Sequence, residues 1–514
     1  MNTFFCMMKL LVFYIFTSLI TYAHVDALEI LAIENIAGKS HWNFMSAVLR
    51  SLSDNGHNVT VFTPFIDGNR VNYTEVYVEL PSKMSLDAVE TLNTFGKPMV
   101  MVPLLMNMTR NYCNIIYGHR DMREILNSGK SNYDIIITEV LSSECAFYVA
   151  SKLDLPMIYV IPSPMITYIE RTVLGDVSNP ATVSHLMAYH AVPRTFVQRL
   201  SNVVLLGFSL FVLIYKEMEL KKIDEQPFDL VEPKKPSLVF MNTHYITNAP
   251  RPMPPSVIQI GGIHLNTPRN IPTDILEFIE NSPHGVIYFT FGSVVAMSTL
   301  PVHIQNAFKE ALAQVPQRVL WKYEGEMKDK PKNVMTSKWF PQRDILMHPN
   351  VKLFISHGGI SGVYEAVDGC VPVLGFPLFY DQPRNIDNLV EAGMGISMDL
   401  LTVEKDELLK NILDLTSNEK YAKNAKISSE RFKDRPMSPA ESVVYWTEYV
   451  VRHKGAPHLK SHAMNLSWYQ YFLLDIVVVL LIFLSLVIFI TYKVFKIIYY
   501  NFLKYLQNIK PKLE

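Results

Sequence analysis

From about residue 28 onward, short apolar runs rich in β-branched residues alternate with longer stretches whose apolar positions have helical spacing. In the first half of the chain, the runs lie at residues 30–36, 59–64, 135–138 and 157–161. Short runs with little polar alternation are typical of parallel strands that are buried on both faces. The segments at 42–52 and 146–152 have the spacing of helices. This alternation predicts an α/β domain with a doubly wound parallel sheet.

A second series of the same kind starts near residue 238. Its apolar runs lie at residues 238–241, 287–291, 319–321, 351–356 and 371–376, with helical stretches between them such as 303–314. Two series predict two Rossmann-like domains that face each other across a cleft, because ligands of open α/β sheets bind beyond the carboxyl ends of the strands. The expected boundaries are 28–248 for the first domain, 249–286 for a partly proline-rich linker, 287–435 for the second domain, and 436–470 for a helix that crosses back to the first domain and leads to a juxtamembrane segment.

Two apolar segments predict how the chain meets membranes. Residues 1–27 combine an early lysine, an apolar stretch and small residues near residue 27, which is the pattern of a cleavable secretory signal; an uncleaved anchor is the alternative. Residues 472–492 are long enough to cross a bilayer and have aromatic residues at both ends. The lysines of 493–514 favour a cytosolic tail. We therefore expect a single-pass type I membrane protein with lumenal catalytic domains.

Two further segments refine this topology. The last five residues, 510–514, resemble a dilysine retrieval signal and predict the endoplasmic reticulum membrane; ordinary membrane-flanking charge is the alternative. Residues 200–215 are apolar but short of a full span. We expect them to form a core or acceptor-pocket helix that also touches the membrane surface, with a second crossing as the less favoured reading.

Composition narrows the class of protein. The 514-residue chain has a net charge of −1 and 18% charged residues, so there is no electrostatic case for nucleic-acid binding. After removal of the signal, Cys113, Cys145 and Cys370 allow at most one disulfide, and no Cys/His cluster has zinc spacing. Sequons favour glycosylation at surface asparagines, here Asn72, Asn107 and Asn465, whereas the sequon at Asn58 falls in a predicted buried strand.

Residues 339–382 carry the strongest functional signal. The apolar run 351–356 leads into His357-Gly358-Gly359-Ile360-Ser361-Gly362, and a helical pattern follows. A strand that turns through glycines into a helix presents unpaired backbone N–H groups and the positive end of a helix dipole, which together suit an anion. Glycine also lets the backbone approach a phosphate closely. The block ends in the polar pair Asp381-Gln382, which suits hydroxyl groups.

The spacing of this block, from Trp339 and Gln342 through His357 and Glu365 to Asp381, resembles the nucleotide-sugar signature of the UDP-glycosyltransferases, glycosyltransferase family 1, and is most similar to the arthropod branch. The resemblance extends over nearly the whole chain. It implies the glycosyltransferase B (GT-B) fold, a UDP-sugar donor and a small lipophilic acceptor. It also implies a possible homo- or hetero-dimer.

The resemblance also implies roles for residues at the predicted donor site. Trp339 would stack on the uracil, Gln342 would contact the uridine, and Glu365 would take the ribose hydroxyls. The remaining predicted donor-site residues contact the diphosphate or the sugar: Ser293, His357, Gly358, Gly359, Ser361, Gly362, Asp381 and Gln382. We expect no metal or other cofactor, since the amides and His357 meet the diphosphate charge and the UDP-sugar is a co-substrate.

The predicted general base is His41, in the first strand-to-helix turn. Imidazole suits this role because its ordinary pKa, about 6.5, lies close to neutrality, and His41 also matches the catalytic histidine of the family. Relatives often support it with an aspartate at the end of the strand that begins near residue 135. Here that residue is Glu139, and Glu144 is the alternative partner.

With the resemblance, these residues imply an inverting transfer of a hexose to hydroxyl groups of small lipophilic compounds, for detoxification or conjugation. The similarity to the arthropod branch favours UDP-glucose over UDP-glucuronate, for whose carboxylate Arg251 is the candidate cation. The apolar stretch 99–108 is a candidate wall of the acceptor pocket. The alternative function is a catalytically inactive, membrane-anchored protein that binds a UDP-sugar or a lipophile.

Overall fold

The structure is a computed structural model that describes residues 27–68, 70–81, 87–128, 132–140, 144–293 and 295–509. Most of the predicted secretory signal (1–26) and the predicted retrieval signal (510–514) lie outside the described residues. The chain divides into two compact units, one up to Lys460 and one from Ser461 to the end. The two parallel α/β sheets of the predicted fold both lie in the first unit.

The first sheet has seven parallel strands in the order β3-β2-β1-β4-β5-β6-β7. Its strands are β1 (Glu29–Ile33), β2 (Asn58–Thr63), β3 (Tyr73–Tyr77), β4 (Ile135–Glu139), β5 (Met157–Ile161), β6 (Leu238–Met241) and β7 (Val257–Gln259). Its helices are α2 (Lys39–Asp54), α3 (Ala88–Phe95), α4 (Pro98–Gly118), α5 (Arg120–Asn127), α6 (Tyr148–Lys152), α7 (Glu170–Leu174) and α8 (Phe196–Ile223), with short 3-10 turns at η1 (Glu144–Phe147), η2 (Thr167–Ile169) and η3 (Pro227–Leu230).

Alternate residues of each strand enter different hydrophobic cores, which explains why these strands read as continuous apolar runs. In β1, Ile30 and Ala32 lie in the core with α2, whereas Leu31 and Ile33 lie in the core with α4. The expected end of the first domain at residue 248 needs correction, because β7 pairs with β6 and extends the first sheet into the predicted linker. β7 has only three residues, too few to show a period.

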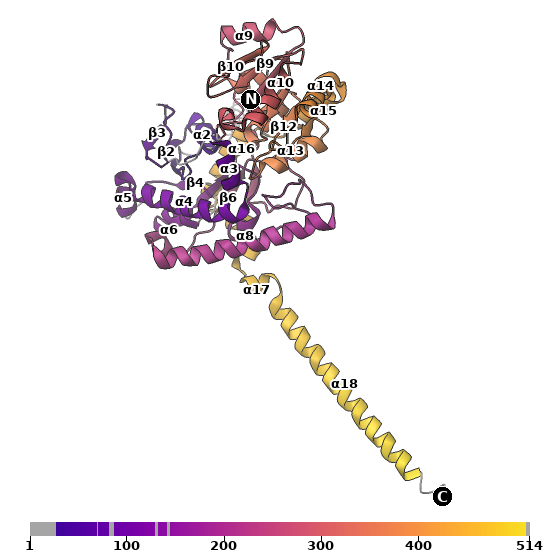
Figure 1. Cartoon of the computed structure of the whole chain (residues 1–514). Helices are drawn as coiled ribbons and strands as arrows, with labels where there is room; N and C mark the ends of the chain where they lie inside the picture. Colours follow the sequence, from indigo (N-terminus) through magenta and orange to yellow (C-terminus); the bar gives the residue numbers. More distant parts are fainter. Residues whose placement is uncertain are drawn as a thin grey trace, which may run out of the picture. The chain divides into compact units, whose positions relative to one another are not determined.

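The second sheet has six parallel strands in the order β10-β9-β8-β11-β12-β13. They are β8 (Val286–Thr290), β9 (Arg318–Lys322), β10 (Val334–Ser337), β11 (Val351–Ser356), β12 (Val373–Gly375) and β13 (Gly395–Ser397). The helices are α9 (Thr273–Glu280), α10 (Val302–Leu312), α11 (Gln342–Leu346), α12 (Ile360–Asp368), α13 (Gln382–Glu391), α14 (Lys405–Ser417) and α15 (Glu419–Lys433), with a 3-10 turn at η4 (Met297–Thr299). Figure 1 labels most of these elements along the chain.

Helix α16 (Pro439–Arg452) returns to the first domain, as the sequence predicts. Its residues Val443 and Val450 are fully buried in the core that α2 shares with the first sheet. In addition, His57 Nε2 at the end of the first βα unit lies 3.3 Å from Glu448 Oε1. The chain therefore ties its second domain to the first before it leaves the first unit.

Helix α8 is longer and more exposed than a core helix. It spans 28 residues, and its most apolar stretch of 18 residues has a mean hydropathy of 1.8 and is 11% buried, so by length and composition the helix could cross a membrane. It packs against α4 on one side and leaves large apolar residues such as Phe196, Val204 and Phe211 exposed. Most of α8 is therefore not a core helix, whereas its expected roles in an acceptor pocket and at a membrane surface stay predictions.

The second unit contains the predicted membrane anchor. It begins with the 3-10 turn η6 (His462–Asn465) and α17 (Trp468–Tyr471), and continues as α18 (Leu474–Ile509). Within Leu474–Gln507, the most apolar stretch of 18 residues has a mean hydropathy of 3.0 and none of it is buried, so this helix is a candidate membrane span. The helix continues beyond the predicted end of the span at residue 492.

The structure shows a buried disulfide and the exposure of the predicted glycosylation sites. Cys113 of α4 and Cys145 of η1 form a disulfide with a Cα–Cα distance of 6.3 Å, and Cys370 is free. Asn72 and Asn107 are exposed, as is Asn465 in the second unit. In the Asn107 sequon, however, the Thr109 hydroxyl is buried and donates to the Leu105 carbonyl at 2.7 Å. The glycosylation of these sites stays a prediction.

Candidate active site

His41 and Glu139 form a hydrogen-bonded pair at the carboxyl ends of neighbouring strands. His41 lies in the first turn of α2, directly after β1, and Glu139 ends β4, which pairs with β1. The distance from His41 Nδ1 to Glu139 Oε1 is 2.6 Å; the Glu139 side chain is 1% exposed and that of His41 is 26% exposed. A carboxylate at this position fixes the tautomer in which Nδ1–H donates and Nε2 is left free to accept a proton. The alternative partner, Glu144, lies in η1, and its side chain is outside the description.

A second carboxyl group supports this pair from inside the protein. Strand register places Ile33 opposite Thr138, so the next residues, Glu34 and Glu139, are neighbours. Glu34 is fully buried, and burial together with the Glu139 carboxylate raises its pKa well above the ordinary value. Within the described part of the chain, the Oε2 atoms of both residues have no other partner. A protonated Glu34 that donates to Glu139 satisfies both oxygens, since two adjacent buried carboxylates do not both ionise.

The second domain faces this pair through the loop before α13. Burial lowers the pKa of His41, but the Glu139 carboxylate and, to a smaller degree, Asp381 reverse this, and the net pKa is raised. Tyr380 is partly buried and packs against the core of the first domain, and burial together with the charges of Asp381 and Glu139 raises the pKa of its phenol. The charge of Asp381 in the second domain therefore acts directly on the predicted base in the first.

The glycine turn after β11 forms the start of a helix. Helix α12 begins at Ile360, two residues before Gly362, with Gly359 as its N-cap. Its first amides have no partner within the helix and point along the axis, as at any helix start, which suits an anion. The Gly358 amide differs from the prediction, because it donates to Ser356 Oγ at 3.2 Å. Gly358 has a φ of +83°, and a Cβ there would lie 2.5 Å from Ile386 Cγ1, so both the conformation and the space require glycine.

His357 lies beside a second glycine loop. A Cβ at Gly292 would lie 2.8 Å from His357 Cε1, which shows how closely the loop after β8 approaches this ring. Burial and the nearby Lys322 ammonium lower the pKa of His357 to about 4, so the ring is neutral at physiological pH. Lys322 Nζ donates to the Gly292 carbonyl at 2.7 Å. Ser293, next in this loop, is exposed and accessible to a ligand.

The predicted uridine-binding residues gather at the start of α11 and on α12. The Gln342 side-chain amide donates to the Glu365 carboxylate, and Tyr288 Oη donates to Gln342 Oε1 at 3.4 Å. Burial raises the pKa of Glu365 to about 7, although the Gln342 hydrogen bond opposes the shift. Trp339 is 67% exposed, which suits a ring that stacks on a base and argues against a core role.

The predicted sugar-binding residues are buried at the start of α13. Asp381 Oδ2 accepts from Asn385 Nδ2 at 2.8 Å, and burial raises the Asp381 pKa. Gln382 Oε1 accepts from the Leu378 amide at 2.9 Å, which leaves the side-chain NH₂ of Gln382 for a ligand. Arg251, the candidate cation for a glucuronate carboxylate, is not free: its Nη2 lies 2.6 Å from Glu170 Oε1.

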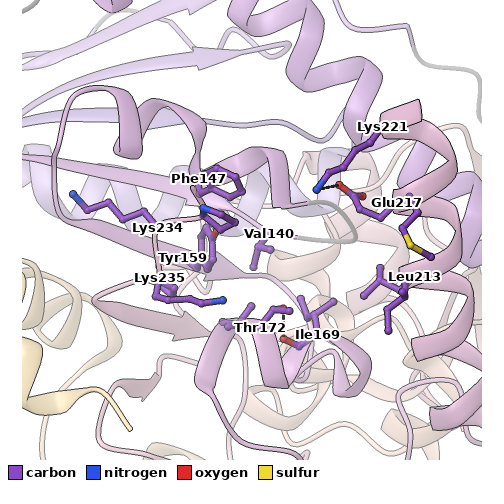
Figure 2. Close-up of a pocket in the computed structure, with 15 residues that line it drawn as sticks. Val140, Phe147, Tyr159, Ile169, Thr172, Leu213, Glu217, Lys221, Lys234 and Lys235 are labelled. Carbon is purple, nitrogen blue, oxygen red and sulfur yellow. Dashed lines mark hydrogen bonds and ion pairs between the residues drawn. The ribbon is translucent and has the colours of Figure 1, made fainter. Parts of the chain in front are cut away.

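A mostly apolar cavity of about 260 Å³ lies between the first sheet, α7 and α8 (Figure 2). Its lining begins at Val140, the residue after Glu139, and includes Phe147, Ile169 and Leu213. Figure 2 shows the ion pair of Glu217 with Lys221, whose atoms are 3.4 Å apart, at its edge. The stretch 99–108 does not contribute to this lining, and its role as a wall of the acceptor pocket stays a prediction.

Sequence reasoning missed several charged residues around these sites, chiefly Glu34, Glu170, Lys322 and Arg384. A signal existed for two of them: Glu34 interrupts the apolar run 30–36, directly after β1 ends at Ile33, and Arg384 follows Asp381-Gln382 on a helix face that is otherwise buried. Isolated charges in apolar segments are rarely buried without a partner. In the described part of the chain, no three His, Cys, Asp or Glu side chains gather as metal ligands.

Comparison with known proteins agrees with this geometry. Residues 30–509 match the family model described as UDP-glucoronosyl and UDP-glucosyl transferase. The chain is 38% identical to UDP-glucosyltransferase 2 of Dactylopius coccus, over 92% of this chain and 93% of that protein. It is 31% identical to UDP-glucuronosyltransferase 2C1 of Oryctolagus cuniculus, over 90% of this chain and 97% of that protein.

Solved structures are similar in fold. A UDP-glucosyltransferase from Polygonum tinctorium, capable of glucosylating indoxyl, has a TM-score of 0.58 at 16% identity and covers 83% of this chain and 99% of its own. The calicheamicin glycosyltransferase CalG4 has a TM-score of 0.53 at 16% identity, over 83% of this chain and 99% of its own. These likenesses confirm the GT-B fold. With a family model that covers the chain from its first strand to the end of its last helix, this protein belongs to the UDP-glucuronosyl and UDP-glucosyl transferases.

Proposed function

We propose that this protein transfers a hexose, glucose in preference to glucuronate, from its UDP-sugar to hydroxyl groups of small lipophilic acceptors, with inversion at the anomeric carbon. Family membership already supports sugar transfer from a UDP-sugar. The observation that carries the proposal further is the hydrogen-bonded pair of His41 and buried Glu139, whose Nδ1 and Oε1 atoms are 2.6 Å apart. The charge of Asp381 in the other domain also raises the pKa of His41.

In this mechanism, His41 Nε2 removes the proton of the acceptor hydroxyl as its oxygen attacks the anomeric carbon. The bond from that carbon to the diphosphate breaks at the same time, and UDP leaves with the negative charge. Glu139 stabilises the imidazolium that forms, and Glu34 holds Glu139 in place. The amides at the start of α12, together with His357, would meet the growing charge of the diphosphate, so the proposal includes no metal.

The preference for glucose and for lipophilic acceptors has separate support. Arg251 forms an ion pair with Glu170, so its charge is not free to bind a glucuronate carboxylate. The apolar cavity beside Val140 suits the apolar part of a lipophilic acceptor. The helix at Leu474–Gln507 suits membrane anchoring. We propose lumenal catalytic domains in the endoplasmic reticulum and a role in conjugation.

The test is turnover in membranes that contain the full-length protein. UDP-glucose and UDP-glucuronate are each incubated with a panel of phenols and other hydroxyl-bearing lipophiles, and UDP and glycoside are measured together. We expect glycoside from UDP-glucose, and loss of turnover in His41→Ala with UDP affinity retained. Saturable UDP-glucose binding without release of UDP would instead identify an inactive binding protein. Activity that survives in His41→Ala would refute the assignment of the base.

A further inference from the structure

Four buried charges meet where the two domains and the segment between them come together. Glu170 begins α7 of the first domain, Arg251 lies in the segment before β7, and Asp381 and Arg384 belong to the start of α13 in the second domain. Glu170 is 1% exposed, Arg384 4% and Asp381 8%, and the Arg251 side chain is 6% exposed. We call these four residues the junction cluster.

An ion pair and hydrogen bonds satisfy part of the junction cluster, but some of its N–H groups have no hydrogen-bond partner within the described residues. Arg251 Nη2 lies 2.6 Å from Glu170 Oε1, and Glu170 Oε2 accepts from the Ser178 amide at 3.0 Å. Arg384 Nη2 donates to Asn248 Oδ1 at 2.9 Å. Within the described residues, Arg384 Nε and Nη1 and Arg251 Nε are buried without a hydrogen-bond partner. Buried N–H groups of this kind call for an acceptor from a ligand or from water.

The charges of the cluster also act on one another. Burial and the neighbouring Arg251 guanidinium lower the pKa of Arg384 to about 10, and the carboxylates of Asp381 and Glu170 oppose that shift. Two cations and two carboxylates leave the cluster formally neutral. Asp381 is also a predicted sugar-binding residue, and its charge raises the pKa of His41, so the cluster contains a carboxylate that acts on the predicted base.

We propose that Glu170 is a donor-selectivity residue that excludes uronic-acid donors by neutralising Arg251. This inference rests on the proposed function. A UDP-glucuronate carries a carboxylate where UDP-glucose carries a hydroxymethyl group. In this proposal, the hydroxymethyl oxygen of glucose accepts a hydrogen bond from an unpaired N–H of Arg384 and adds no charge to the site. A carboxylate at the same place would be a third anion beside two cations in a buried site, and an unpaired buried charge is strongly disfavoured.

The experiment compares donors at a fixed acceptor in membranes that contain the full-length chain. Glu170→Gln keeps the size of the side chain and removes its charge, which leaves Arg251 uncompensated. We expect the ratio of kcat/KM for UDP-glucuronate to that for UDP-glucose to rise at least about tenfold, which corresponds to about 1.4 kcal/mol. The double variant Glu170→Gln/Arg251→Gln should return the ratio to near the wild-type value, because the freed cation is gone.

A matched control separates this effect from the loss of any buried ion pair. Asp229 of η3 is 3% exposed and lies 2.7 Å from Arg110 Nη2 in the same domain, outside the junction cluster. Asp229→Asn should leave the donor ratio unchanged. A donor ratio in Glu170→Gln that stays within twofold of the wild type, with UDP-glucose still used, would overturn the inference and leave the proposed function intact. Absence of transfer from both donors in the wild type would overturn the proposed function instead.

A binding measurement keeps the inference testable if Glu170→Gln does not fold. The His41→Ala variant binds donors without turnover in the proposed mechanism, so the affinities of UDP-glucose and UDP-glucuronate can be compared directly by titration. We expect at least tenfold weaker binding of UDP-glucuronate. Equal affinities would show that the cluster does not exclude a carboxylate and would overturn the inference.

Discussion

The Glu139→Gln substitution tests the catalytic pair most directly, because it keeps the shape of the side chain and removes only its charge. When His41 takes a proton, an imidazolium forms next to Glu139, whose Oε1 is 2.6 Å from Nδ1 and whose side chain is 1% exposed. Two unit charges with centres about 4 Å apart interact by about 4 kcal/mol at an effective dielectric constant of 20. That energy corresponds to roughly a thousandfold in rate, within the range of about 10²–10⁴ typical of general-base catalysis. We therefore expect kcat to fall about a thousandfold.

The pH profile gives a second, independent readout of the same substitution. His41 acts as a base only when it is neutral, so activity rises as the pH increases through its pKa. Burial lowers this pKa, and the Glu139 carboxylate more than compensates. Removal of the carboxylate charge therefore lowers the pKa of His41. The acid limb of kcat/KM should move to lower pH in Glu139→Gln even though the maximum rate falls.

The assay measures glycoside formation from saturating UDP-glucose between about pH 5 and 9, together with UDP affinity by titration. UDP affinity should stay within about threefold of the wild type, because Glu139 belongs to the opposite domain from the predicted uridine site. Glu139→Asp, which keeps the charge, serves as the control and should retain more activity than Glu139→Gln. A Glu139→Gln rate within tenfold of the wild type, or an acid limb that does not move, would refute the role of this pair.

Three further predictions concern binding and stability. Trp339→Ala should weaken UDP binding at least tenfold without changing the unfolding temperature, since the ring is 67% exposed; an unchanged affinity in a UDP titration would contradict a stacking role. Gly358→Ala should destabilise the protein by about 1–3 kcal/mol, measured by denaturant unfolding, because φ is +83° and the new Cβ would lie 2.5 Å from Ile386 Cγ1. Asp229→Ala should cost about 3 kcal/mol in the same measurement, because it removes both of the short hydrogen bonds of the buried Arg110 guanidinium and leaves it, among the described residues, only the Glu217 carboxylate at 3.4 Å and the Asp224 carbonyl at 3.2 Å; a loss below 1 kcal/mol would show that solvent reaches this arginine.

The sequence predicted most of the parallel strands because their hydrophobic runs are local and strong. The runs at 135–138 and 157–161 correspond to β4 and β5 almost residue for residue, since every position of both strands is buried. The four edge strands, β3, β7, β10 and β13, were missed, because each has only one buried residue and so lacks a continuous apolar run. The helix at α8 was recognised, but its burial was not, because an apolar sequence looks alike whether its side chains meet a core or the surface.

In the candidate site, too, the sequence predicted the features that depend on neighbouring residues and not those that depend on contacts between distant residues. The glycine turn after β11 could be predicted because strand, turn and helix start are consecutive in the chain, and the anion-binding amides follow from that local order. The sequence also nominated His41 and Glu139 separately, by their positions at strand ends. It could not choose between Glu139 and Glu144, because both follow the apolar run of β4 and only the folded chain shows which side chain reaches His41.

Tertiary structure alone decided which charges meet. The register of β1 and β4 brings Glu34 beside Glu139, and the packing of α13 against the segment before β7 brings Arg384 toward Arg251. The partner of Arg251 is Glu170, far away in the chain, and this pairing changes what the arginine can do for a donor. A sequence encodes hydrophobic periodicity over a few neighbouring residues, whereas a buried charge takes its properties from atoms that only the folded chain brings within a few ångströms.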